Sequence, residues 1–184
     1  MTQVNKWHLV VAAAIGAAIA LSASSAVRSA YQAQSIDEFE RLLDQVPVLL
    51  DPNAAQATRG VMKRSMVAHA NRDANAAIAE LGEGYAWIAV SEDGYQEMVS
   101  GRETAAEATR NLYQGDGLKN YLGATSTPIA IAGNFGIQVD YDNFQKADGS
   151  IEVKKTLSVF EVRGGKLLHL WSFWPGATEL SKSK

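Results

Sequence analysis

The sequence predicts an α+β domain in which helices come first and long antiparallel strands follow. Two observations carry this prediction. Between positions 35 and 81 the apolar residues recur at the three-to-four-residue spacing of helices. In the last third, long alternating stretches are separated by glycine-containing turns, as in strands joined by hairpins. With 184 residues, 47% of them hydrophobic and 20% charged, the chain is long enough and apolar enough for one globular domain with a sizeable core.

Charge and cysteine content exclude several classes of protein. The chain has 17 Lys and Arg against 20 Asp and Glu, and this net charge of −3 gives no electrostatic basis for binding nucleic acid. The absence of cysteine excludes disulfides, thiolate metal sites and a lipid-attachment cysteine. His69 and His169 are the only histidines beyond the first 26 residues and lack ligand spacing, so we expect no metal and no cofactor.

The first 36 residues contain no Asp or Glu. Lys6 precedes the apolar run Leu9–Leu21, and small residues fill 22–26, which is the pattern of a secretory signal peptide cleaved after position 26. An uncleaved membrane anchor over residues 9–27 and a buried core helix are the alternatives. The first two interpretations place the domain outside the cytoplasm, as a periplasmic, secreted or outward-facing anchored protein, with the uncleaved leader as the only membrane contact.

Four helices are expected in the remainder. Ser35 caps the first, which runs to Val46 with acidic residues in its first turn. This helix and a short tether make up residues 27–55. The other three are expected at 54–70, 74–81 and 101–113.

Six strands are expected, at 85–90, 95–100, 122–132, 134–145, 151–163 and 166–174. Pro128 indicates an edge, a bulge or an irregular start in the third of them. In the fourth, Ile137, Val139 and Tyr141 share a face that we expect to point inward, which turns Asp140 and Asp142 outward.

Three segments resemble the SnoaL-like branch of the nuclear-transport-factor-2-like (NTF2-like) superfamily. They are AHANRDANAAIAEL at 68–81, SGRETA at 100–105, and SVFEVRGGKLLHLWSFW at 158–174. The resemblance covers residues 56–176 and leaves a polar tail at 177–184. It implies a cone, in which a three-helix layer packs on a strongly bent antiparallel sheet around an apolar pocket, with the N-terminal helix as an addition. It also implies a homodimer through the outer sheet face.

The catalytic residues of this superfamily are not matched by the sequence. The positions of the ketosteroid isomerase tyrosine, general-base aspartate and oxyanion-hole aspartate fall on Ser65, Ala89 and Ser158, which cannot perform that chemistry. The Asp-Arg-Asp set of the epoxide hydrolases is not recognisable while Asp140 and Asp142 face outward. No inward acid suits a cyclase.

The aligned strands predict an aromatic pocket with a few polar groups, suited to a small apolar or aromatic molecule. The alternative is that these side chains simply fill the cone. The expected lining is Ser65, His69, Tyr85, Trp87, Tyr141, Ser158, Phe160, Ser172 and Trp174.

His69 is the one inward group that titrates near neutral pH, so it is the candidate acid or base, although a histidine in a helix is also often a satisfied structural residue. His169, Trp171 and Phe173 fall on the opposite face of the last strand and predict a partner surface, unless they pack under the N-terminal helix.

The sequence therefore favours an exported protein that binds a small apolar or aromatic ligand, with no assignable catalytic set. The first alternative is an isomerase, hydratase or cyclase with His69 as base and Ser65 or Tyr141 as hydrogen-bond donor. The second is a non-catalytic dimeric structural or accessory subunit.

Overall fold

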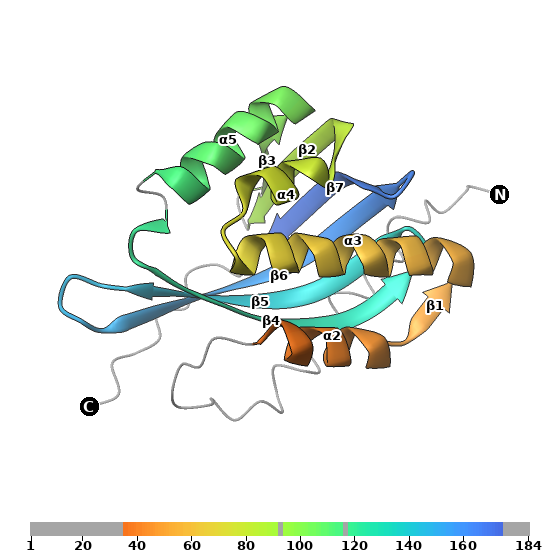
Figure 1. The fold of residues 1–184 in the computed structure, drawn as a ribbon, viewed down its shortest axis with the longest axis horizontal. Coiled ribbons are helices and arrows are strands. Elements are labelled where there is room, and N and C mark those ends of the chain that lie inside the picture. Colours follow the sequence, from red (N-terminus) through yellow and green to blue (C-terminus); the bar gives the residue numbers. More distant parts are fainter. Residues whose placement is uncertain (1–34, 92–93, 116–117, 175–184) are drawn as a thin grey trace.

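A computed structural model describes residues 35–91, 94–115 and 118–174 (Figure 1). The expected leader at 1–26, the tether before residue 35 and the tail at 177–184 lie outside the described residues. The helices are α2 (Ile36–Gln45), α3 (Pro52–Ala70), α4 (Ala74–Ala79) and α5 (Arg102–Gln114). The strands are β1 (Val48–Leu50), β2 (Leu81–Ser91), β3 (Gly94–Ser100), β4 (Tyr121–Ala132), β5 (Phe135–Gln145), β6 (Ile151–Arg163) and β7 (Lys166–Phe173).

The strands form one seven-stranded sheet in the order β1-β4-β5-β6-β7-β2-β3. Its pairs are antiparallel except β1 with β4 and β2 with β7, which run parallel. Figure 1 shows α3 lying along one side of the sheet with α4 and α5 beside it, and the β5–β6 hairpin extending beyond α3. The predicted α+β class, with its helical layer on a bent and mostly antiparallel sheet, is confirmed. Among the described residues no helix is both long and apolar enough to cross a membrane.

Local capping signals mark where α2 and α3 begin. The Ser35 hydroxyl accepts a hydrogen bond from the Glu38 N–H at 3.1 Å, as an N-cap should. Asp51 does the same for α3, accepting from Asn53 and Ala54 at 3.2 Å, and Pro52 occupies the first helical turn. The helix therefore begins two residues before the expected position.

Strand β2 begins at Leu81, four residues earlier than expected. The backbone N–H of Leu167 donates to the Glu80 carbonyl at 2.8 Å, and Leu81 pairs with Leu167. The start of β2 is thus set by a parallel partner 86 positions along the chain, which no local pattern reveals. The same holds for β1, a three-residue strand that was not expected and that pairs with the end of β4.

Apolar side chains are buried on both faces of the sheet. We call the face that packs against the helices the inner face; its core joins α2, α3 and α5 to the strands through Phe39, Leu43, Ala55, Val61, Met62, Tyr85, Ala105, Ile131, Phe160, Val162 and Leu167. A second cluster lies on the outer face, with Ala130, Ile137 and Val159 at its centre and Phe135, Leu157, Trp171 and Phe173 packed against them.

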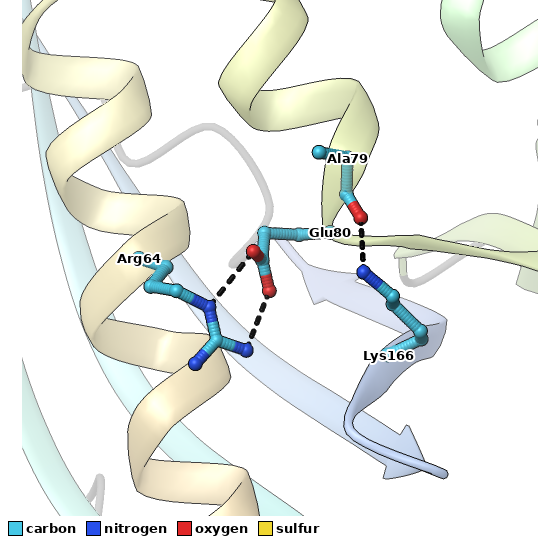
Figure 2. Close-up of polar contacts among 4 residues, drawn as sticks. All are labelled: Arg64, Ala79, Glu80 and Lys166. Carbon is cyan, nitrogen blue, oxygen red and sulfur yellow. Dashed lines mark hydrogen bonds and ion pairs between the residues drawn. The ribbon is translucent and has the colours of Figure 1, made fainter.

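An ion pair ties α3 to the junction between α4 and β2 (Figure 2). Arg64 Nε and Nη2 donate to the two Glu80 oxygens at 2.8 and 2.9 Å, in a bidentate arrangement. The Glu80 side chain is only 9% exposed, whereas that of Arg64 is 53% exposed. Lys166 Nζ reaches the Ala79 carbonyl at 2.6 Å, so the start of β7 is attached to the same junction.

Replacing Arg64 by methionine should lower the free energy of unfolding by about 1–3 kcal/mol, because the buried Glu80 carboxylate loses its partner. Arg59→Met is the matched control. Arg59 pairs with the 73%-exposed side chain of Asp44, and such surface pairs contribute at most about 1 kcal/mol. Urea denaturation of both variants measures the difference, and equal losses would mean that burial of Glu80 gives this ion pair no special weight.

Candidate functional site

His69 lies near the end of α3 between two tyrosine hydroxyls. Its Nδ1 is 2.9 Å from the Tyr113 hydroxyl on α5, and its Nε2 is 2.7 Å from the Tyr121 hydroxyl at the start of β4. Both tyrosine rings stand edge-on to the imidazole, with centroids 5.7 and 5.4 Å away. Three elements far apart in the sequence therefore meet at one titratable group.

The hydrogen bonds around His69 run in one direction. Tyr121 donates its hydroxyl proton to Asp142 Oδ1 at 3.1 Å. Its oxygen must then accept from the His69 Nε2–H, and this leaves Nδ1 to accept from Tyr113. The network thus assigns the Nε2–H tautomer and forms a chain from Tyr113 through His69 and Tyr121 to Asp142, which we call the His69 relay.

The surroundings of the relay keep the His69 imidazole and the two tyrosine hydroxyls uncharged, and Asp142 is its carboxyl member. Burial lowers the pKa of His69; the charge of Asp140 opposes this shift and that of Arg72 adds to it. Burial raises the pKa of Tyr113 to about 12 and also raises the pKa of Tyr121. At pH 7 the imidazole is therefore neutral and both hydroxyls keep their protons. The pKa of Asp142 is raised, chiefly by burial, while the Tyr121 hydrogen bond and Lys154 oppose the shift.

A second polar group, the Asp140 cluster, spans three neighbouring strands on the inner face. Asp140 Oδ1 accepts from the Ser126 hydroxyl at 2.5 Å and from Gln138 Nε2 at 2.7 Å, and Oδ2 accepts from the Ser158 hydroxyl at 2.7 Å. Burial raises the pKa of Asp140, and the three hydrogen bonds oppose that shift. These four residues form a carboxyl site whose two oxygens are both occupied by donors from β4, β5 and β6.

Polar side chains continue across the inner face beyond the Asp140 cluster, and we call this line from Ser126 on β4 to Trp87 on β2 the polar row. Ser158 pairs with Ser172 on β7, and the Ser172 hydroxyl accepts from Trp87 Nε1 at 3.0 Å. Trp87 lies on β2, so a line of hydrogen-bonding side chains crosses the inner face from β4 to β2.

The expectation that β5 turns Tyr141 inward and its acids outward is wrong. Asp140 bonds to Ser126 and Ser158 across the neighbouring strands, and Asp142 bonds to Tyr121 of the relay. Tyr141 lies on the outer face, where Lys155 Nζ is 5.7 Å from its ring centroid. Because the sheet buries apolar side chains on both faces, the apolar side of β5 does not identify the interior.

The other residues expected to line the pocket lie in several different parts of the structure. Ser65 is half-buried one turn before His69, and Trp87, Ser158 and Ser172 lie in the polar row. Tyr85 and Phe160 belong to the inner core, whereas Trp174 is 46% exposed beyond the end of β7. The structure thus brings His69 to the inner face with the serines and Trp87, places Tyr141 on the outer face, and leaves Trp174 exposed after the end of β7.

The sequence does not indicate the partners of His69, nor the Asp140 cluster apart from Ser158. It predicts a strand that starts one residue after Tyr121 and a helix that ends at Tyr113, and gives neither tyrosine a place in the site. A usable signal existed for Asp140: the hairpin between β4 and β5 pairs it with Ser126, so two polar residues face each other there.

His169, Trp171 and Phe173 lie on the outer face of β7, as expected from alternation. His169 Nδ1 is 2.7 Å from Glu161 Oε2, and Arg163 Nε donates to Glu161 Oε1 at 2.6 Å. The Trp171 ring is 5.1 Å from that of His169. The N-terminal helix α2 buries its apolar residues in the inner core, so it does not cover this row, and the partner surface stays a prediction. No three His, Asp or Glu residues within the described ranges lie close enough together to hold a metal.

Comparisons with known proteins place the fold. No family model matches this chain, and no curated protein does. Among solved structures it is similar to an epoxide hydrolase of the LEH-like type from M. tuberculosis, with 20% identity and TM-score 0.52 over 67% of this chain and 85% of that one. It is also similar to a putative ketosteroid isomerase from Kribbella flavida, with 18% sequence identity and a TM-score of 0.53. That match covers 67% of this chain and 82% of the isomerase chain. A third similar structure is an NTF2-like protein of unknown function from Mesorhizobium loti, with 14% sequence identity and a TM-score of 0.51. That match covers 71% of this chain and 100% of the other.

Proposed function

We propose that this chain, which has the NTF2-like fold, is an enzyme that transfers protons on a small, neutral and largely apolar molecule. The proposal corresponds to the isomerase, hydratase or cyclase alternative, with His69 as the acid–base group. Tyr121 and Asp142 replace Ser65 and Tyr141 as its supporting residues. Binding of an apolar or aromatic molecule, which the sequence favours, is the first step of such a reaction.

The one-directional His69 relay is the observation that carries this proposal. A neutral imidazole has one basic and one acidic nitrogen, and here a hydroxyl occupies each of them at 2.7 and 2.9 Å. When Tyr113 receives a proton from the bound molecule, it gives its own proton to His69 Nδ1. The Nε2 proton then passes to Tyr121, and the Tyr121 proton passes to Asp142. The reverse sequence returns the proton to a different atom of the same molecule.

Burial adapts two members of the relay to this task, the terminal carboxylate Asp142 and the central imidazole His69. The raised pKa of Asp142 makes it a better proton acceptor than an exposed carboxylate. The lowered pKa of His69 keeps the imidazole unprotonated and ready to accept at pH 7. A histidine that served only to fill a helix face would not need a carboxylate connected to it through a tyrosine.

Proton transfer at carbon can be detected without knowing the natural substrate. A panel of neutral cyclic ketones and hydroxyketones is incubated with the full chain in D₂O, and loss of the C–H signals next to the carbonyl is followed by proton NMR. His69→Gln keeps hydrogen-bonding capacity but cannot titrate, so we expect exchange to fall by about 10²–10⁴-fold. His169→Gln, which alters the outer face, should exchange like the parent. Equal rates in both variants and the parent would contradict the proposal.

Export and self-association are expectations that accompany this proposal. The pattern of residues 1–26 supports export, to the periplasm or the outside, with an anchored form as the alternative. The outer-face cluster with Trp171 and Phe173 supports a homodimer through that face.

A further inference from the structure

One buried acceptor on the inner face has no hydrogen-bond partner among the described residues. It is Oε1 of Gln138, a residue only 6% exposed. Native structures pair nearly all such atoms, because a buried polar atom without a partner loses its hydrogen bonds to water and gains none in return. An orphaned oxygen beside a carboxyl cluster therefore calls for a partner from outside the fold.

The orientation of this amide is determined by its neighbour. Gln138 Nε2 donates to Asp140 Oδ1 at 2.7 Å. The opposite orientation would place the amide oxygen against the carboxylate oxygen, where two acceptors repel. Asp140 thus holds the NH₂ group on its own side and directs Oε1 away from it.

The hydrogen-bond donors of the Asp140 cluster and of the polar row are already engaged. The hydroxyls of Ser126 and Ser158 both donate to Asp140, and Trp87 Nε1 donates to Ser172. On β4 the residue opposite Gln138 is Pro128, which has no N–H. The fold therefore presents an acceptor with no donor assigned to it.

The carboxyl groups near Gln138 indicate what charge a bound partner should have. Asp140 already accepts three hydrogen bonds, so it does not need a cation to satisfy its oxygens. A second carboxyl, Asp142, lies on the same face of β5 and disfavours a bound anion. A neutral group with an O–H or N–H donor satisfies both conditions.

We propose that Gln138 Oε1, held in place by Asp140, is the recognition point for a neutral substrate that presents a hydroxyl or N–H donor, as in a hydrophobic alcohol. This inference rests on the proposed function in that it names the substrate class of the same inner-face site. Gln138 is a specificity residue in it and takes no part in the proton transfer.

The test measures binding rather than turnover. Cyclohexanol, cyclohexanone and cyclohexanecarboxylate are titrated into the full-length protein, and Kd is obtained from shifts of the glutamine side-chain amide signals and from calorimetry. The parent should bind the alcohol at least about tenfold more tightly than the ketone, as expected for one hydrogen bond, and the carboxylate least.

Two glutamine substitutions on β5 test the acceptor. Gln138→Met removes Oε1 and should reduce the alcohol preference to within about twofold. Gln145→Met makes the same chemical change at the exposed end of the strand, outside the Asp140 cluster, so it should keep the preference. Equal binding of alcohol and ketone by the parent, no binding of either, or a preference that survives in Gln138→Met would each overturn the proposal.

His69→Gln distinguishes this inference from the proposed function. If that variant keeps the alcohol preference while the parent shows no proton exchange, the relay chemistry is wrong and the recognition site stands. If the parent exchanges protons but shows no alcohol preference, the recognition site is wrong and the relay stands.

Discussion

Replacing Phe39 by alanine should lower the free energy of unfolding by about 3–5 kcal/mol, the usual cost of deleting a fully buried ring. Phe39 is 1% exposed and packs in the inner core with Leu43, Val61 and Met62. Its helix, α2, contacts both α3 and β4. The deletion therefore opens a cavity where the N-terminal helix meets the rest of the domain, and urea denaturation followed by circular dichroism should show one transition at a lower midpoint.

Tyr95→Ala is the matched control for Phe39→Ala. Tyr95 is an aromatic residue on the edge strand β3, and at 83% exposure its loss should change the free energy of unfolding by less than about 1 kcal/mol. A second possibility is that Phe39→Ala melts α2 alone and leaves the midpoint of the remainder unchanged. That outcome would make residues 27–55 an appendage to the domain at 56–176, as the sequence division suggests, and would contradict the expected cooperativity.

The parts of the fold that could be predicted depend on local signals. Ser35 and Asp73 cap helices through their own side chains, and the break at residues 71–73 follows from that capping. The hairpin turns at Gly149 and Gly164 use positive φ angles of 81° and 56°, which glycine adopts freely. By contrast, β1 and the start of β2 exist because of parallel partners far along the chain, so no window of sequence contains their cause.

The candidate site could be predicted only in part, and for a specific physical reason. Strand alternation shows which residues share a face, but burial decides which face is inside. Here the outer face holds Ile137, Val159 and Trp171 in an apolar cluster of its own. On β5 the polar side chains consequently point toward the helices, which inverts the usual expectation for Asp140 and Tyr141. His69 could be singled out because, within residues 35–91, 94–115 and 118–174, it is the one histidine that lies on a helix, and that helix faces the strands.

The polar inner face also has a consequence for stability. His69 has a lowered pKa in the folded state, so between that pKa and the ordinary value of 6.5 the unfolded chain binds more protons. Across this interval the contribution of His69 makes the free energy of unfolding rise with pH and fall on acidification. The raised pKa values of Asp140 and Asp142 act in the opposite sense above 3.8, because there the folded chain holds more protons. A fold selected only for stability would avoid such groups, which supports a functional reason for keeping them.

Tyr121→Phe should lower the rate of proton exchange by about 10²–10⁴-fold, because it removes the one oxygen that links His69 to Asp142. The ring itself is kept and still packs at 5.3 Å from that of Phe144, so the variant should fold. In the parent the rate should rise with pH through the pKa of His69, below 6.5, since only the neutral imidazole accepts a proton. Proton NMR titration of the His69 ring, in a chain with only three histidines, measures that pKa directly.

Tyr141→Phe is the control that decides between the two faces of β5. It removes a hydroxyl from the same sheet, but from the outer face, where Lys155 lies over the ring. If the relay is the acid–base centre, Tyr141→Phe exchanges protons like the parent, and Tyr121→Phe loses both the rate and its dependence on the titration of His69. If Tyr141→Phe loses the rate and Tyr121→Phe keeps it, the chemistry belongs to the outer face and the His69 relay is structural. The two hydroxyl deletions are chemically identical, so the difference between them can come only from where each oxygen lies.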